Sequence, residues 1–380
     1  MIDFGDALDG LARQHLRREL TVLEGRRGRL VELEGRALVN FAGNDYLGLS
    51  VHPEVIAEAS RALATYGLGA GASRLMSGTY QAHRELEDDL ARLKRTEAAL
   101  VFSSGYLANL AVLGTLPEGG DLLMLDRNCH ASLVDAARLS KATLRVFPHN
   151  DLSELAKRLT RRTGGRTFIV TEGVFSMDGD LAPVGELAAL ARRTGSWLVL
   201  DDAHGIGCFG PSGAGVLEHA GVRPDGHTVV IGTLSKAVGA VGGFVAASAE
   251  VRDWLVNRAR PFIYTTALPP ALCAGARKSV ELLRVGRDLR RQLWRNVTHL
   301  RRALSGLGLE LGQSASQIIP IIVGEPDRAV ALAARCREAG LLVPAIRPPT
   351  VRAGSSRLRV SVTALHQPED LDRLVSTLTD

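Results

Sequence analysis

A lysine within a run of small residues is the feature that most constrains this chain. Residues 232–239 read Gly-Thr-Leu-Ser-Lys-Ala-Val-Gly and follow an apolar run at 228–231. Open α/β sheets bind ligands at the carboxyl ends of their strands, and small residues there let the backbone approach a ligand closely. Because shielding from water destabilises an ammonium ion, Lys236 is a candidate nucleophile toward an aldehyde. A solvated loop lysine is the alternative.

A second apolar run also ends in polar residues. Residues 197–205 read Trp-Leu-Val-Leu-Asp-Asp-Ala-His-Gly. Pyridoxal phosphate, the common aldehyde cofactor, works best with its ring nitrogen protonated, and a buried pyridinium needs a carboxylate beside it. Asp201 fits that role, and His204 could donate to the phenolic oxygen of the ring. The alternatives are a helix cap or turn for Asp201 and Asp202, and a structural role for His204.

Four motifs resemble one known family. They are Asn-Asp-Tyr-Leu-Gly-Leu at 44–49, Thr-Glu-Gly-Val-Phe-Ser-Met-Asp-Gly-Asp at 171–180, Asp-Asp-Ala-His-Gly at 201–205 and Gly-Thr-Leu-Ser-Lys at 232–236. In this order they resemble the pyridoxal-phosphate-dependent α-oxoamine synthases over essentially the whole chain. The resemblance implies an aspartate-aminotransferase-like fold (PLP fold type I), an α/β fold whose large domain has a mostly parallel central sheet and is followed by a smaller α+β domain.

One further motif points to a branch of this family. Residues 345–351, Ala-Ile-Arg-Pro-Pro-Thr-Val, resemble the biotin-pathway members more than their relatives. This implies decarboxylative condensation of L-alanine with a pimeloyl thioester, carried by coenzyme A or by a carrier protein, to give 8-amino-7-oxononanoate. The alternatives are a glycine-using sister enzyme that makes aminoketobutyrate or aminolevulinate, and a binding or regulatory module without chemistry.

A cofactor phosphate site is predicted where a strand runs into a helix. The strand-like run 98–102 is followed by Ser104, Gly105 and Tyr106 and then by an apolar helical pattern. Free backbone amides at a helix N-terminus bind phosphate without a basic side chain. The resemblance supports Gly105 and Tyr106 as cofactor contacts, and an ordinary helix cap is the alternative.

The resemblance also implies roles for residues that the local pattern does not single out. His130 stacks on the pyridine ring, contacts substrate and assists proton transfer, Ser176 bonds the cofactor, and Thr233 binds its phosphate. The family enzymes are homodimers with active sites at the interface, where Thr265 and Thr266 resemble residues that reach the neighbouring subunit's phosphate. Glu172 has two interpretations, orienting the site or a structural acid.

Substrate contacts are predicted near both ends of the chain. The resemblance selects Arg17 for the acyl substrate, with its neighbour Arg18 left open, and gives Asn44 and Thr350 as further substrate contacts. In residues 356–362, Ser-Arg-Leu-Arg-Val-Ser-Val, alternation places both arginines on one face of a strand. The resemblance selects Arg359 for the amino-acid carboxylate, whereas alternation alone does not separate it from Arg357.

The chain of 380 residues is long enough for a large domain with a companion. We predict an N-terminal helix and hairpin segment at 1–44, a cofactor-binding domain at 45–275 and an α+β domain at 276–380. The helix is expected within residues 4–20, where leucines form a loose helical stripe. Beyond 275 the pattern gives a helical stretch at 279–307 and then strand, helix, strand, strand, helix.

Composition excludes several classes of protein. Basic and acidic residues number 46 and 41 and are interspersed, and aromatic residues are only 4%, so no nucleic-acid-binding stripe is indicated. The four cysteines lack the spacing of a zinc or redox motif, which predicts reduced thiols and no metal. No apolar run approaches the roughly 18 residues of a membrane span. The acidic N-terminus lacks a secretory signal, so we expect a cytoplasmic protein.

Overall fold

The computed structural model describes residues 3–160 and 164–379, and the chain divides into two compact units. The large unit comprises Leu49–Phe175 and Leu181–Arg290. The small unit comprises Met1–Gly48, Ser176–Asp180 and Arg291–Asp380. The predicted N-terminal segment and C-terminal domain therefore contribute to the same unit, and a five-residue excursion at 176–180 joins them there.

A seven-stranded sheet forms the centre of the large unit. Its spatial order is β4-β10-β9-β8-β7-β5-β6. All neighbouring strands are parallel except β10, which runs antiparallel to both β4 and β9. This is the mostly parallel central sheet that the sequence predicts. The strands are β4 (Ala98–Phe102), β5 (Leu122–Asp126), β6 (Thr143–Phe147), β7 (Thr167–Glu172), β8 (Trp197–Asp201), β9 (Thr228–Thr233) and β10 (Gly243–Ala247).

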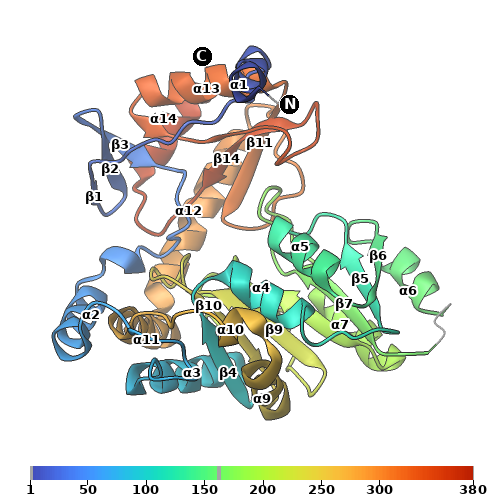
Figure 1. Ribbon diagram of the computed structural model, residues 1–380. Helices are drawn as coiled ribbons and strands as arrows, with labels where there is room; N and C mark the ends of the chain where they lie inside the picture. The colour runs from blue at the N-terminus through green and yellow to red at the C-terminus, as the bar shows by residue number, and fades with distance from the viewer. Residues whose placement is uncertain (1–2, 161–163, 380) are drawn as a thin grey trace. The chain divides into compact units, whose positions relative to one another are not determined.

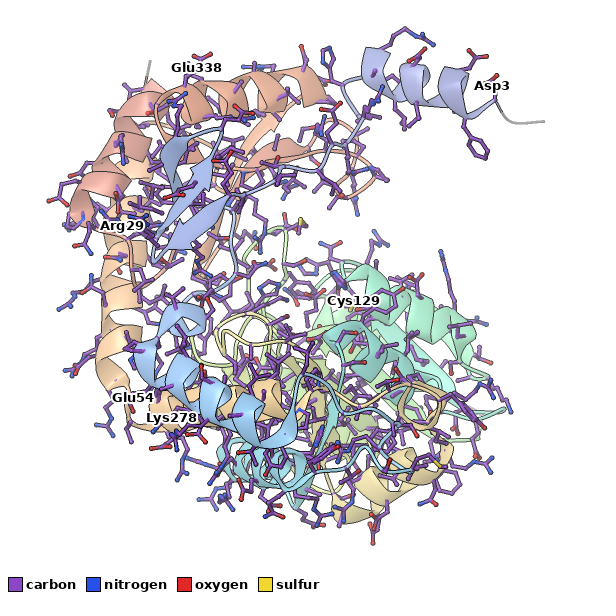
Figure 2. The ribbon with its side chains drawn as sticks, turned by 60° about the vertical axis from the view of Figure 1, so that its left-hand side comes forward. Asp3, Arg29, Glu54, Cys129, Lys278 and Glu338 are labelled. Carbon is purple, nitrogen blue, oxygen red and sulfur yellow. The ribbon has the colours of Figure 1, made fainter. Side chains whose placement is uncertain are left out.

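The inner strands consist of apolar runs because helices cover both faces of such a sheet. Every residue of the inner strands β7, β9 and β10 is buried, and so is every residue of the edge strand β4. Figure 1 shows α2, α3 and α11 gathered beside the β4 edge, and α2 and α3 both pack against α11. The labelled pair Glu54 and Lys278 marks where α2 meets α11 in Figure 2, with 3.2 Å between carboxylate and amine.

Helices of the large unit alternate with strands from β4 to β9, and further helices come before and after this stretch. They are η1 (Leu49–Val51, a 3-10 turn), α2 (Pro53–Tyr66), α3 (Gln81–Lys94), α4 (Gly105–Leu113), α5 (Ala131–Leu139), α6 (Leu152–Thr160), α7 (Val184–Thr194), α8 (Val216–His219), α9 (Ala249–Arg258), α10 (Arg260–Ile263) and α11 (Pro270–Val285). The next helix, α12 (Arg287–Ser305), contains the boundary between the units.

Two small sheets organise the small unit. One has the order β1-β2-β3-β12 and the other β11-β14-β13. Glu34 and Gly35 make the predicted turn between β2 and β3, both with positive φ. The elements are α1 (Phe4–Arg13), β1 (Gly25–Arg27), β2 (Leu30–Leu33), β3 (Arg36–Asn40), β11 (Ile318–Gly324), α13 (Pro326–Glu338), β12 (Leu341–Leu342), β13 (Ala345–Ile346), β14 (Ser356–Ser361) and α14 (Pro368–Thr379).

Two predicted helices differ from the observed ones. The N-terminal helix ends at Arg13, because His15 adopts a left-handed conformation with φ of 55° and turns the chain. The stretch at 279–307 is two helices, since α11 ends and α12 begins on either side of Gly286. A glycine costs a helix interior about 1 kcal/mol relative to alanine, so this break lies at the weakest point of the helical pattern.

The C-terminal region also has one more strand than predicted. Both β12 and β13 contain only two residues, which is too short for alternation to be recognised. Among the helices of residues 3–160 and 164–379, none combines the length and apolarity needed to cross a bilayer.

Candidate active site

Lys236, the candidate nucleophile, follows the carboxyl end of strand β9, as predicted. Its Nζ is 2.9 Å from Nε2 of His204, which follows the neighbouring strand β8. The turn that follows Lys236 ends at Gly239, whose φ is +72° and whose amide donates to the carbonyl of Lys236. Lys236 is half-buried and His204 is buried. The two strand ends that the sequence singled out therefore meet at one edge of the sheet.

The two adjacent aspartates point into different environments. At the end of β8, Asp201 accepts hydrogen bonds from the Asn109 side-chain amide at 2.8 Å and from the Ala203 backbone at 3.0 Å. Asp202 instead forms a buried ion pair with Lys94, with 2.6 Å between Nζ and Oδ2. The charge of Asp202 is therefore neutralised within the protein, whereas Asp201 is held by neutral donors.

His130 is the N-cap of α5 and lies on the neighbouring strand-to-helix turn. Its Nδ1 is 2.8 Å from the hydroxyl of Ser132 and also accepts from the Ser132 backbone amide at 3.2 Å. Partial burial lowers the pKa of His130, and Lys236 acts in the same direction against the opposing charge of Asp201. The ring is therefore neutral near pH 7, with Nδ1 as an acceptor.

The side chain of Glu172 contacts the same strand-to-helix turn. One of its carboxylate oxygens accepts from the His130 backbone amide, and in the sheet Glu172 is paired with Asp201. Burial first, and then the charge of Asp201, raise the pKa of Glu172 to about 8. Of the two interpretations of Glu172, its contact with His130 favours orienting the site.

The predicted phosphate site lies where α4 begins. Ser104 is the N-cap, and its hydroxyl accepts from the Leu107 amide at 3.2 Å. A Cβ added to Gly105 would lie 3.5 Å from Cβ of Thr233, so the helix N-terminus is next to the end of β9. The Thr233 hydroxyl is 2.7 Å from that of Ser235. Helix amides and hydroxyl groups thus converge, which is a donor set suited to a phosphate.

Three other residues are predicted to contact the cofactor, namely Tyr106, Thr265 and Thr266. Tyr106 is partly exposed, and its hydroxyl donates to Asp135, which raises the pKa of the phenol. Thr266 pairs with Ser73 through an isolated β-bridge, next to Thr265.

A second group of predicted residues gathers within the small unit. On β14, Arg359 donates to the carbonyl of Ser176 at 2.6 Å and to the side chain of Asn44 at 3.3 Å. Its neighbour Arg357 forms an ion pair with Asp178. Both arginines are 5% exposed. No carboxylate pairs with Arg359 within the described part of the chain, so its charge is available to an acidic ligand.

The two N-terminal arginines also differ. Arg18 donates to the Thr350 hydroxyl at 3.2 Å, which brings two predicted substrate contacts together. Arg17 is exposed and lies 3.9 Å from Glu19. Arg347, which donates to the backbone carbonyl of Arg17, adds a further cation, and burial together with Arg18 lowers its pKa. Arg17 is the residue that the resemblance selects for the acyl substrate, and Arg18, its alternative, is the one that contacts Thr350.

Three buried polar residues around the site were missed at the sequence level. They are Lys94, Asn109 and Ser132. Asn109 offered a signal, because it is the one amide in the otherwise apolar or small helix Gly-Tyr-Leu-Ala-Asn-Leu-Ala-Val-Leu. A polar side chain in such a helix needs a buried partner.

Comparisons with known proteins identify the family of this chain. Residues 36–378 match the family model described as aminotransferase class I and II. The 8-amino-7-oxononanoate synthase of Stutzerimonas stutzeri is 46% identical over 378 residues, which cover 100% of this chain and 96% of the relative. The enzyme of that name from Geobacter sulfurreducens is 47% identical over 374 residues, 98% and 95% of the two chains. The chain belongs to the 8-amino-7-oxononanoate synthase family.

Solved structures of related proteins have the same fold. Serine palmitoyltransferase from S. paucimobilis, with a bound PLP-myriocin aldimine, superposes with a TM-score of 0.94 at 33% identity, covering 100% of this chain and 98% of that one. The 8-amino-7-oxononanoate synthase of Francisella tularensis superposes with a TM-score of 0.79 at 28% identity, covering 90% and 97%. The predicted membership in the α-oxoamine synthases and the aminotransferase-like fold are both confirmed.

The residues of the large unit fit the cofactor of this family. Pyridoxal phosphate requires an amine, a carboxylate for its ring nitrogen and donors for its phosphate. Lys236 and Asp201 could supply the first two, and the start of α4 with Thr233 could supply the third. Gly243 contributes by lacking a side chain, since a Cβ there would lie 2.5 Å from the Gly105 amide nitrogen. The backbone at the helix start thus depends on a glycine in β10.

Proposed function

We propose that this chain condenses L-alanine with a pimeloyl thioester to give 8-amino-7-oxononanoate, CO₂ and the free thiol, as a step of biotin synthesis in the cytoplasm. It is a pyridoxal-phosphate-dependent acyltransferase. The observation that carries this proposal is the meeting of Lys236, His204 and Asp201 at neighbouring strand ends, in a chain 46% identical to enzymes of this name.

Lys236 has two proposed tasks. Its amine would hold the cofactor covalently, and its Nζ would act as the base that removes the α-proton of alanine. When bound, pyridoxal phosphate supplies the electron-withdrawing ring that makes this proton acidic. Positioned proton transfer of this kind contributes about 10² to 10⁴ in rate. The half-buried position of Lys236 next to His204 supports both tasks.

Asp201, His204 and His130 are proposed to hold the ring. Asp201 would keep the ring nitrogen protonated, because a carboxylate in low dielectric stabilises a neighbouring cation. His204 would donate to the phenolic oxygen, and the neutral imidazole of His130 would stack on the ring and assist proton transfer. The burial of Asp201 and His204 supports these roles, since both interactions strengthen away from water.

The phosphate is proposed to bind at the start of α4. Ser104, Gly105 and Tyr106 would contact it with Thr233, and Ser176 is proposed to bond the cofactor as well. We also propose a homodimer in which Thr265 and Thr266 reach the phosphate bound by the partner subunit. Support for this comes from exposed apolar side chains in the two segments that the Ser73–Thr266 bridge joins, namely Leu68, Leu75, Met76 and Tyr264.

The substrates are proposed to bind the arginines of the small unit. Arg359 would hold the alanine carboxylate together with Asn44, because its buried charge lacks a carboxylate partner among residues 3–160 and 164–379. Thr350 and an N-terminal arginine would contact the acyl substrate. Arg17 is the residue that the family resemblance selects, and the contact between Arg18 and Thr350 supports Arg18.

The proposed reaction is tested by measuring thiol release with a matrix of substrates. Alanine with pimeloyl thioester is expected to react, whereas glycine with acetyl or succinyl thioester is expected to react at least about 10-fold more slowly, as one methylene changes binding by about 1–3 kcal/mol. Faster release from glycine and a short thioester would overturn the assignment. A Lys236→Ala variant is the control, and it should lose both turnover and the visible absorption of the bound cofactor.

A further inference from the structure

A buried asparagine connects two residues of the proposed site that lie on different elements. Asn109, on α4, is 2% exposed. Its Nδ2 donates to Oδ2 of Asp201 at 2.8 Å and to the Ser132 hydroxyl at 2.8 Å. The Ser132 hydroxyl in turn lies 2.8 Å from Nδ1 of His130. A continuous hydrogen-bonded chain therefore runs from Asp201 through Asn109 and Ser132 to His130.

The direction of each bond in this chain follows from its members. Asp201 as a carboxylate only accepts, so the Asn109 atom facing it must be the amide nitrogen. The second proton of that nitrogen is donated to the Ser132 oxygen. The Ser132 hydroxyl can therefore donate its own proton to His130. The Ser132 backbone amide also donates to Nδ1 at 3.2 Å. Nδ1 thus faces donors only, and the ring carries its proton on Nε2.

The other end of Asn109 supports this interpretation. Its Oδ1 is buried and has no hydrogen-bond partner within residues 3–160 and 164–379. An asparagine that only tied elements together would be expected to use both ends, because an unpaired buried carbonyl is costly. Here the two donors alone determine the orientation of the amide.

We propose that Asn109 is a positioning residue that holds Asp201 and His130 in one frame and, through Ser132, selects the tautomer of His130. The inference rests on the proposed roles of Asp201 and His130 at the cofactor ring. It adds that Asp201, at the end of β8, and His130, at the start of α5, are positioned together. The charged groups that affect the pKa of His130 are Asp201, Lys236 and Asp135.

The test is an Asn109→Leu variant of the holoenzyme, which keeps the side chain's approximate size and removes both donors. We expect kcat to fall about 10- to 100-fold, as is typical when a group that orients a site residue is lost. We also expect the pH midpoint of the cofactor's visible absorption to move by about one unit, because the carboxylate near the ring loses a stabilising donor. Asn109→Asp should be more severe, since it sets a second carboxylate next to Asp201.

Asn296→Leu is the matched control. Asn296 is also a buried asparagine whose Nδ2 donates twice, to the carbonyls of Thr363 and His366, but it lies in the small unit. It should lower the melting temperature without moving the absorption midpoint. If Asn109→Leu behaves in the same way, Asn109 is only structural and the inference is overturned.

Ser132→Ala tests the link to His130 even if the Asn109 variants fold poorly. Removing this hydroxyl should change the pH profile of kcat, and an unchanged profile would contradict the proposed chain. Combined with Asn109→Leu, its effect on kcat should be less than multiplicative, because both break the same chain. Asp201→Asn is measured in parallel. If that variant leaves the absorption midpoint unchanged, the proposed role of Asp201 fails, whatever Asn109 does.

Discussion

Two neighbouring aspartates illustrate how one residue position changes the chemistry available to a side chain. Asp201 ends β8 and accepts hydrogen bonds from neutral donors. The carboxylate of Asp202 packs against the following loop, where the absence of side chains at Gly205 and Gly215 leaves room for it. A Cβ added to either glycine would lie within 2.0 Å of an Asp202 oxygen, at 1.9 and 1.7 Å. Asp202 is therefore part of the packing next to the proposed site, whereas Asp201 is proposed to belong to the site itself.

This difference predicts opposite effects of two matched substitutions. Asp201→Asn should fold normally and lose about 10²- to 10³-fold in turnover, because it removes a preorganised charge. Asp202→Asn should leave Lys94 buried without its counter-charge and lower the free energy of unfolding by about 3–5 kcal/mol. Turnover assays and denaturant unfolding of both variants measure this. Equal losses of turnover at equal stability would show that the two carboxylates are not separated in this way.

Glu172 predicts a pH dependence of stability at the same scale. Its pKa is about 8 in the folded protein and near 4.5 in the unfolded chain. Between these values the folded state holds a proton that the unfolded state releases, so the contribution of this group to stability is full below about pH 4.5 and is lost as the pH rises toward 8. Glu172→Gln removes the titration and keeps an acceptor for the His130 amide.

The expected result is a difference in melting temperature between Glu172→Gln and the parent protein that grows in favour of the variant from pH 5 to pH 8. Thermal unfolding of the cofactor-free proteins measures it. A difference that stays constant over this range would mean that Glu172 is ionised in the folded state throughout.

At the scale of elements, the turn after β9 determines where the lysine lies. Gly239 closes this turn with φ of +72°, and a Cβ there would lie 2.2 Å from the backbone nitrogen of Ser50. The turn thus packs directly against backbone at the start of the large unit. No side chain can be accommodated without moving one of the two segments.

We expect Gly239→Ala to lower stability and to reduce cofactor uptake, because any shift of the turn also moves Lys236. Its matched control is Gly221→Ala, where φ is +68° and no atom lies within 4 Å of the added Cβ. That variant should lose only the about 1–2 kcal/mol of a left-handed non-glycine residue. Absorption titration with cofactor and denaturant unfolding compare the two. Similar uptake in both variants would exclude the steric explanation.

At the scale of the whole molecule, exposed apolar side chains predict association of two copies. Leu68, Met76 and Tyr264 are 84%, 81% and 70% exposed, in segments of the large unit that the Ser73–Thr266 bridge joins. Exposed apolar surface can mark an interaction site. Tyr264 directly precedes Thr265 and Thr266 in the chain, which is consistent with the proposed contribution of these threonines to a partner's phosphate site.

Leu68→Asp is therefore expected to dissociate the dimer and to reduce cofactor affinity at micromolar protein concentration, since a charge at an apolar interface is left unpaired. Val285→Asp is the control, because Val285 is also exposed, at 73%, but ends α11 elsewhere in the large unit. Sedimentation velocity measures the mass of each variant. A parent protein that sediments as a monomer at all concentrations would contradict the proposed dimer.

Much of the fold could be predicted because the patterns that specify its strands involve residues close together in the sequence. Buried parallel strands are continuous apolar runs, and the polar residues directly after them lie at one edge of the sheet. The placement of Lys236, Asp201 and the start of α4 at strand ends could therefore be predicted from the sequence. The helix boundaries were less accurate, since single residues such as His15 and Gly286 end or interrupt a helical pattern that otherwise continues.

The remaining assignments depend on contacts between residues far apart in the chain. Alternation placed Arg357 and Arg359 on one face of β14, and only the ion pair of Arg357 with Asp178 distinguishes their charges. In the sequence, Asn109 is only a single polar residue in an apolar helix. Only the tertiary structure shows that its partner is Asp201, 92 positions later. Periodicity along a chain specifies which side chains are buried, whereas the identity of a buried group's partner depends on how strands and helices pack, and no local pattern encodes it.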